Sequence, residues 1–514
     1  MDYTHHKVVI AGMGLAALAS AARMYELGIR DIAIYTKGYG GSPVIAAINF
    51  VLPDNPYGDT IEKYAEDMFN AGYRIANRKL VNEMAENTMN GYDLLTRWGI
   101  EFAKNPDGTT KLRHVSGHTF PRSLCSTKEL IGVEIVDKLI ASLKEKGVKF
   151  YEGYECVKVL SDKNKVYGIT VKDKNGNLEN VYSEIVIAAW GGVGNLFGSS
   201  TYPMDIKGNT LSIAKEAGAD LIDVEFLEYE PMVVAYPPGA VGEPCPTAML
   251  GEGAHLLNSK GERFLLKVRP QGEAGSPKTL LNKQIWKEVN LGNGTEHGGV
   301  YVDLRHIDRE VLKAYPWFFD RLMENGVDLN EQLLEVSPMA HSFSGGIKVD
   351  SNYESTVKGL YAIGEACGGI HGACRCAGNA ASQAVLSGLL CGQAVAEAAA
   401  NKTEEKKEFP IEYNTDKEVY NKYVPQIKEI AVKALGIYRD GKLLEDAKKI
   451  IADILEKDEL AKDTETLQIA ESIYFMLKAA SERKESRGTH MRLDYPEESK
   501  EFEKEITIWS RGKI

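Results

Sequence analysis

The sequence has few cysteines, no long apolar run and no excess of basic residues, and each shortage excludes a class of protein. Seven scattered cysteines among 514 residues do not form a disulfide framework, so a reduced, cytoplasmic interior is the simplest expectation. No stretch approaches the roughly 18 apolar residues of a membrane span. The formal charge of -12 argues against general binding to nucleic acid or to an anionic membrane, because both need a basic face.

Several catalytic motifs are also missing. The sequence contains no P-loop, no zinc-protease motif and no nucleophile elbow. A strand is expected directly after residues 1–7, which leaves no room for a signal peptide. A hydrophobic content of 44% and a length of 514 residues suit an ordinary globular protein of two to four domains.

The most informative feature present is a glycine turn between an apolar strand at 8–11 and a helix expected over 15–27. Gly12 permits the tight turn, Gly14 lets the backbone approach a pyrophosphate, and Ala17 occupies the third small position. Phosphate would then lie on the free N–H groups at the start of the helix. The contacts expected here come from Gly12, Gly14, Leu15, Ala16 and Ala17.

A second, distant segment complements this turn. Residues 359–366 read as a strand that runs into a loop carrying Glu365, where the ribityl chain of a flavin would need a partner. The strand after the glycine turn ends in Thr36 and Lys37 and lacks the acid expected for a ribose diol, although Thr36 can still bond a hydroxyl. Together the two segments predict a flavoprotein whose FAD site is closed by both ends of a long chain.

Further segments, in order, resemble the flavoprotein subunits of succinate dehydrogenase and fumarate reductase, with L-aspartate oxidase as a close relative. The resemblance covers nearly the whole chain. It implies an α/β fold in which a Rossmann-like FAD-binding domain is interrupted by an α+β capping domain and followed by a C-terminal helical domain. The segments that carry it are 185–192, 201–203, 208–210, 217–220, 251–264, 341–347, 364–375, 439–441 and 485–492.

This architecture predicts domain boundaries. The FAD-binding domain is expected at 1–235 and 345–400, the capping domain at 236–344 and the helical domain at 401–514. Residues 401–408 read as a charged, solvated connector. Three Lys- and Glu-rich amphipathic segments are expected to form a helical bundle, at 419–435, 443–455 and 464–485.

The resemblance also implies a set of cofactor-binding residues. Pro43 occupies the region where complex-bound members present a histidine that attaches the flavin, and proline has no nucleophile, so non-covalent FAD is expected. Cys374 and Cys376 are one residue apart, which fits neither a zinc nor a ferredoxin pattern, and no metal is expected. Beyond the glycine turn, the implied FAD contacts are Thr36, Lys37, Ser42, Ala189, Gly191, Gly192, Gly364, Glu365, Arg375, Gly378, Ala380 and Ala381.

The reaction implied by the resemblance exchanges a hydride between flavin N5 and a substrate carbon, while a side chain moves a proton on the other face. His341 and Arg375 stand where the family has its substrate-binding histidine and arginine. Arg375 could bind a carboxylate bidentately. Arg122, in a loop that resembles one near the flavin, either adds positive charge to the site or stabilises the loop. The plainer interpretations are a buried histidine and a surface arginine.

Other positions depart from the family. Leu250 takes the place of its proton-donating arginine and Thr247 that of an acid. Glu230 replaces a histidine and Met232 a threonine. One guanidinium and one imidazole are therefore lost, and a carboxyl and two apolar groups are gained.

These departures predict a change of substrate. Glu230 would repel a dicarboxylate that the missing arginine no longer stabilises, so efficient fumarate reductase or succinate dehydrogenase activity is not expected. Arg375 suggests one carboxylate on the substrate, and Leu250 with Met232 suggests an apolar portion. Glu230 would suit an amine or a hydroxyl, or could itself move the proton if burial raises its pKa. Its alternative role is an ion pair within the capping domain.

Three further hypotheses stay open. One is an amino-acid or amine oxidase resembling L-aspartate oxidase, with Glu230 facing the ammonium. Another is an electron-relay subunit that docks an iron–sulfur protein or other electron carrier through the helical domain, which carries Arg487 and His490. The third is a catalytically inactive binding module. In each enzyme hypothesis the partner is a small-molecule substrate and not a nucleic acid.

Overall fold

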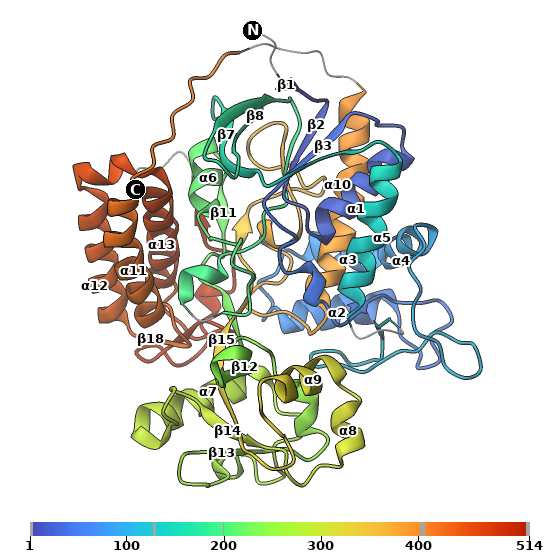
Figure 1. Cartoon of the computed structure of the whole chain (residues 1–514), viewed down its shortest axis with the longest axis vertical. Helices are drawn as coiled ribbons and strands as arrows, with labels where there is room; N and C mark the ends of the chain where they lie inside the picture. The colour runs from blue at the N-terminus through green and yellow to red at the C-terminus, as the bar shows by residue number, and fades with distance from the viewer. Residues whose placement is uncertain (1–3, 127–129, 199, 401–406, 510–514) are drawn as a thin grey trace. The chain divides into compact units, whose positions relative to one another are not determined.

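A computed structural model describes residues 4–126, 130–198, 200–400 and 407–509 (Figure 1). By internal contacts the chain forms two compact units. Unit 1 comprises Met1–Leu196, Pro203–Phe226 and Phe343–Ile514, and unit 2 comprises Phe197–Tyr202 and Leu227–Ser342. The domain boundaries expected from the sequence stay a prediction.

A five-stranded parallel sheet forms the centre of unit 1 (Figure 1). Four of its strands are apolar and buried, as in parallel sheets covered by helices on both faces, whereas the edge strand at 149–152 is partly exposed. Val9 pairs with Val186 on one side and with Ala33 on the other. In spatial order the strands are β17 (Leu360–Ala362), β10 (Val186–Ala188), β2 (Val8–Ala11), β3 (Ile32–Thr36) and β6 (Lys149–Glu152).

Two helices from distant parts of the chain pack closely beside this sheet. They are α1 (Leu15–Glu26), which is rich in alanine, and α10 (Asn379–Ala399). Their close approach needs glycine, because a Cβ at Gly388 would collide with the carbonyl oxygen of Ala16. The two ends of the FAD-binding sequence are thus held together by direct helix–helix packing.

Other elements of unit 1 surround this centre. A second sheet has the strand order β1-β9-β8-β7, and α5 (Ile131–Glu145) packs on α1. The remaining elements are β1 (Thr4–His5), β4 (Ile48–Asn49), α2 (Ile61–Ala71), α3 (Arg78–Glu86), α4 (Thr88–Arg97), β5 (Ser123–Leu124), β7 (Glu155–Ser161), β8 (Val166–Lys172), β9 (Leu178–Tyr182), α6 (Thr210–Ala217), β11 (Leu221–Ile222), β16 (Gly346–Ile347), β18 (Tyr438–Arg439), β19 (Met491–Arg492) and β20 (Thr507–Ile508).

The three predicted C-terminal helices are confirmed. They are α11 (Lys417–Ala434), α12 (Gly441–Leu455) and α13 (Thr464–Glu482), which pack against one another. Each begins at an aspartate whose carboxylate accepts hydrogen bonds from free backbone N–H groups. Most of the predicted connector at 401–408 lies outside the described residues. No helix of the described chain is long and apolar enough to cross a membrane.

Unit 2 is an α+β unit built on a four-stranded sheet of order β12-β15-β14-β13. Apolar side chains from the sheet and from three helices form one buried core. The elements are β12 (Leu227–Tyr236), β13 (His255–Leu257), α7 (Lys278–Glu288), β14 (Val300–Asp303), α8 (Arg309–Lys313), α9 (Pro316–Glu324) and β15 (Leu334–Phe343).

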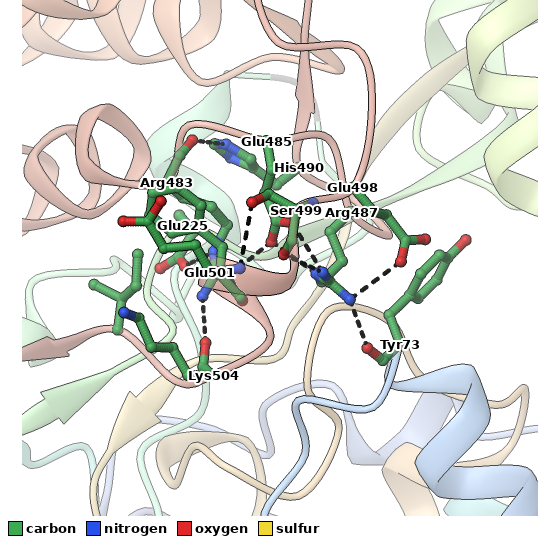
Figure 2. Close-up of polar contacts among 12 residues, drawn as sticks. Tyr73, Glu225, Arg483, Glu485, Arg487, His490, Glu498, Ser499, Glu501 and Lys504 are labelled. Atoms are coloured by element: carbon green, nitrogen blue, oxygen red, sulfur yellow. Dashed lines mark hydrogen bonds and ion pairs between the residues drawn. The ribbon is translucent and has the colours of Figure 1, made fainter.

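A buried ionic network ties the C-terminal segment of unit 1 to the turn that follows β11 (Figure 2). Arg483 donates to Glu225 at 2.6 Å and to Glu485 at 3.0 Å. Arg487 binds Glu485 through two parallel bonds of 2.7 and 2.9 Å. These four side chains are at most 2% exposed, so each charge depends on its partners.

Asp223, at the edge of this network, gives a pH prediction. Burial and the adjacent Glu225 raise its pKa to about 8, although Arg483 lies 3.7 Å away. The folded state therefore binds a proton that the unfolded state releases near pH 4, so this group reduces stability progressively from about pH 4 to pH 8. Asparagine cannot ionise. We therefore expect the free energy of unfolding of Asp223→Asn, relative to the wild type, to rise by roughly 1 kcal/mol per pH unit in that window.

Urea unfolding of both proteins between pH 5 and 9 measures this difference. The gap in free energy of unfolding should widen up to about pH 8 and then level off. A gap that is constant across the range would show that Asp223 does not titrate there.

Candidate functional site

The sequence-predicted cofactor residues gather at one edge of the parallel sheet. Gly12 follows β2, Lys37 follows β3, Ala189 follows β10 and Gly364 follows β17. The carboxyl ends of parallel strands lie at the same edge, where open α/β sheets bind their ligands. The structure thus brings together segments that are far apart in the sequence.

The glycine turn has the geometry that a pyrophosphate requires. Gly12 has φ +109°, and a Cβ there would collide with the carbonyl oxygen of Ala189. Gly14 is the N-cap of α1, so the helix start presents backbone N–H groups and no side chain. Ser42, another predicted contact, accepts a hydrogen bond of 2.8 Å from the N–H of Leu15. The hydroxyl therefore lies at the helix N-terminus where phosphate is expected.

This geometry makes Gly12→Ala a sharp test. An alanine here would strain the backbone at its positive φ, and its Cβ would collide with the carbonyl of Ala189. We therefore expect FAD affinity to fall by at least about 100-fold. Gly28→Ala is the matched control, because Gly28 has φ +92° with open space around it. Flavin content per protein after gel filtration measures both. Equal flavin content in the two variants would contradict the assignment of the turn.

The loop after β17 approaches the loop after β10. A Cβ at Gly192 would lie 2.7 Å from the Glu365 carboxyl carbon, and Gly364 has φ +59° with its own Cβ position 2.9 Å from the Cβ of Ala16. The Glu365 carboxylate accepts a hydrogen bond of 2.8 Å from the N–H of Phe343. Gly191 also has a positive φ of +78°. Only glycine fits at Gly191, Gly192 and Gly364, where the two loops approach each other. Glycines in such positions are typical of a backbone that lies directly against a ligand.

The remaining predicted contacts lie at the start of α10. Gly378 has φ +78° and is the N-cap of this helix. Its Cβ position lies 2.8 Å from the side-chain amide of Asn49, so a larger residue would displace Asn49. Ala380 is exposed and Ala381 is buried. Contact of these residues with FAD stays a prediction.

The polar side chains at the end of β3 already have partners within the protein. The Thr36 hydroxyl donates to the carbonyl of Gly38 at 2.6 Å and is itself within reach of the Gly38 N–H. Lys37 lies 3.7 Å from Glu155, and burial lowers the pKa of this lysine. Thr36 thus holds its own loop, and a bond from its hydroxyl to a ribose stays a prediction.

Arg122 lies inside a buried charge network. Its guanidinium pairs with Asp59 at 2.6 Å and with Asp67 at 2.5 Å, and none of it is exposed. It also donates to Nδ1 of His118, whose pKa burial lowers to about 4, so this imidazole is neutral. Both carboxylates pair with the one buried guanidinium, which supports the loop-stabilising role. A catalytic role for Arg122 stays a prediction.

Arg375 lies in the loop 371–376 of unit 1 and is half-buried. Its guanidinium contacts the carbonyl of Cys376 at 3.5 Å. All seven cysteines are free thiols, and burial raises the pKa of Cys367 to about 12. Cys367 and Cys376 are buried and Cys374 is half-buried, and Arg375 is the charged group of this loop.

Glu230 and His341, the other two predicted catalytic residues, meet in unit 2. Glu228 and Glu230 are two residues apart on β12, so both side chains point to the same side of the strand. Lys278, the first residue of α7, lies 2.5 Å from Glu230 and 3.6 Å from Glu228. Nε2 of His341, on β15, is 3.8 Å from Glu230, and its Nδ1 is 2.9 Å from the Thr201 hydroxyl. We call these five residues the Glu230 cluster.

Sequence reasoning missed Lys278. Its one local signal is a lysine in the first turn of a helix that begins after Pro277, where a positive charge is unfavourable unless carboxylates lie near. The helix is fixed on β12 because Asn282 donates to the carbonyl of Tyr229 at 2.8 Å. The alternative interpretation of Glu230, an ion pair within the capping region, thus describes part of its environment.

The Glu230 cluster holds more carboxylates than cations. Among its described contacts, two carboxylates share the Lys278 ammonium. Glu228, Glu230 and His341 each offer one ligand atom, and these atoms lie within 4.8 Å of one another, which could hold a metal ion. The Lys278 ammonium already pairs with both carboxylates. The sequence-based expectation of no metal stays a prediction.

Leu250 and Met232 are 3% and 0% exposed and belong to the apolar core of unit 2 with Cys245 and Met249. Contact of these two side chains with an apolar part of the substrate stays a prediction.

Comparison with known proteins agrees with this geometry. The pattern of an FAD binding domain matches residues 7–381, and that of the fumarate reductase flavoprotein C-terminal region matches residues 425–513. An FAD-dependent oxidoreductase of Methanocaldococcus jannaschii is 30% identical over 98% of this chain and 96% of its own. A fumarate reductase (CoM/CoB) subunit of Methanothermobacter marburgensis is 27% identical, over 98% of this chain and 96% of its own.

L-aspartate oxidase of Bacillus subtilis is 28% identical over 95% of this chain and 91% of its own. Among solved structures, a quinol-fumarate reductase chain superposes with a TM-score of 0.88 at 24% identity, covering 100% of this chain and 99% of its own. The fold with FAD-binding, capping and C-terminal helical parts is thereby confirmed, and so is FAD as the cofactor. The chain belongs to the FAD-dependent oxidoreductases of the fumarate reductase and succinate dehydrogenase flavoprotein family.

Proposed function

We propose that this oxidoreductase acts on a small organic substrate other than fumarate or succinate. The observation that supports the proposal is the Glu230 cluster, in which two carboxylates lie together and share the Lys278 ammonium. A dicarboxylate would bring two further negative charges to a partly buried site, where like charges repel strongly. A substrate with one carboxylate and an amine or hydroxyl fits better.

The proposed roles follow from the chemistry of each side chain. FAD, when bound, supplies the hydride acceptor or donor. Arg375 holds a carboxylate through its planar guanidinium. His341, oriented by the Thr201 hydroxyl, holds or polarises the substrate. Glu230 moves the proton, and the Lys278 ammonium, 2.5 Å away, positions its carboxylate.

A second candidate is an amino-acid or amine oxidase. The negative cluster favours it, because an ammonium group on the substrate would compensate the excess charge. Relatives named L-aspartate oxidase support an amino-acid substrate, although aspartate itself carries two carboxylates. Peroxide production from amino acids in the presence of oxygen separates this candidate from the first. The rate is compared with turnover of the same amino acids when a dye is the electron acceptor.

A third candidate is an electron-relay role with an iron–sulfur subunit or another electron carrier, in a cytoplasmic location. The match of residues 425–513 to the fumarate reductase flavoprotein C-terminal region supports it. Copurification of a brown iron–sulfur protein from the native cell would establish it. A preparation that is catalytically complete as a single chain would refute it.

One experiment tests the proposed function most broadly. The purified yellow protein is mixed anaerobically with a panel of amines, hydroxy acids and carboxylates while the flavin band is followed. We expect bleaching by a compound with at most one carboxylate. Acid precipitation of the same preparation should leave FAD in the supernatant, because Pro43 offers no attachment point.

A further inference from the structure

A turn near the C-terminus lies directly against the loop that carries Arg375. The N–H and the hydroxyl of Thr489 both donate to the carbonyl of Ala373, at 3.0 and 3.1 Å. Gly488 has φ +55°, and a Cβ there would collide with the same carbonyl. Arg375 is two residues further along, so the turn fixes the backbone from which the Arg375 side chain starts.

The other side of the loop is fixed by the segment 72–74. The N–H of Ala373 donates to the carbonyl of Gly72 at 3.1 Å, and a Cβ at Gly372 would lie 2.5 Å from that carbonyl oxygen. Tyr73 and Arg74 adopt left-handed φ angles of +55° and +64°, which are uncommon for such residues and need support from their surroundings. Ala373 is therefore held between two backbone segments.

Arg487 connects these two segments. Its guanidinium donates to the carbonyl of Tyr73 at 2.9 Å, as Figure 2 shows. The same guanidinium binds both oxygens of Glu485, and it reaches Glu498 at 3.2 Å and the carbonyl of Ser499 at 3.0 Å. With 2% exposure and partners on every side, this side chain has one conformation available.

We propose that Arg487 and the turn 487–490 are positioning elements for Arg375. They hold the loop 371–376 from a segment more than a hundred residues further along the chain and set where the guanidinium meets a substrate carboxylate. The inference rests on the proposed function, in which Arg375 binds that carboxylate. It extends the site to residues that touch neither substrate nor cofactor.

Gly488→Ala is the main probe, since its methyl group would displace the carbonyl of Ala373. Gly99→Ala is the control, because Gly99 has φ +85° and open space around it. Thr489→Val removes only the hydroxyl bond, and Arg487→Lys keeps the charge but loses the paired geometry. The two milder variants keep the test valid if Gly488→Ala does not fold.

Two measurements report on the loop without any substrate. Hydrogen exchange of the peptide that contains 371–376 should be faster in Gly488→Ala and in Arg487→Lys than in the wild type or Gly99→Ala. Alkylation of the half-buried Cys374, quantified by peptide mapping, should accelerate in the same variants. Unchanged exchange and unchanged alkylation would overturn the proposal.

A third measurement reports on Arg375 itself. Propionate, a simple monocarboxylate, is titrated against the flavin absorbance of the FAD-loaded protein. We expect about tenfold weaker binding in Gly488→Ala, and no further weakening when Gly488→Ala is added to Arg375→Gln. A loop with a merely structural role would give independent effects and overturn the positioning role. If the loop is loosened but Arg375→Gln leaves propionate affinity unchanged, the proposed function is refuted instead.

Discussion

Lys278→Met is expected to destabilise the protein by about 3–5 kcal/mol and to abolish most turnover. The substitution removes the Lys278 ammonium from the buried Glu228 and Glu230 carboxylates, which is the costly way to break a buried ion pair. Turnover should fall by about 100- to 10,000-fold, because a well-positioned acid or base contributes that much and Glu230 loses the group that positions it. Urea unfolding and dye-coupled turnover measure the two effects.

The double variant Lys278→Met with Glu230→Gln separates charge from shape. Removal of one carboxylate should restore much of the lost stability but not the turnover. Lys283→Met is the matched control, since Lys283 lies exposed on the same helix. If Lys278→Met and Lys283→Met unfold at the same urea concentration, the Glu230 cluster does not stabilise unit 2.

Arg122→Leu is expected to cost about 3–5 kcal/mol of stability, because it leaves Asp59 and Asp67 buried and unpaired. Arg113→Leu, at an exposed position of the same segment, should change stability by about 0.5 kcal/mol or less. Urea unfolding at pH 7 measures both.

Arg122→Lys then distinguishes structure from catalysis. Lysine keeps the charge but cannot form the forked pair with two carboxylates. A variant that folds stably and turns over normally supports the structural role. A stable Arg122→Lys protein with turnover lowered by about 100-fold or more would assign Arg122 to the reaction instead.

The cofactor half of the site could be predicted from the sequence because its signals are local. The strand, the glycine turn at Gly12 and Gly14 and the following helix are adjacent in the chain, and the structure confirms each element within about one residue. The C-terminal helices were predictable for the same reason, since their apolar spacing and capping aspartates are local features.

The substrate half could not be predicted fully because its partners are brought together only by tertiary structure. Lys278 meets Glu230 through the packing of α7 on β12, and nothing in the spacing of 48 residues indicates that pair. Likewise, the sequence shows that Leu250 is apolar but not whether an apolar side chain faces the core or a ligand. Only the folded structure shows that Leu250 packs in the core of unit 2.

The most direct test of the central claim is rapid mixing of anaerobically reduced protein with fumarate while the flavin band is followed. The two adjacent carboxylates of the Glu230 cluster predict that the band does not return on the timescale of enzyme turnover. Reoxidation by fumarate at roughly 1–1000 per second would contradict the proposed exclusion of dicarboxylates.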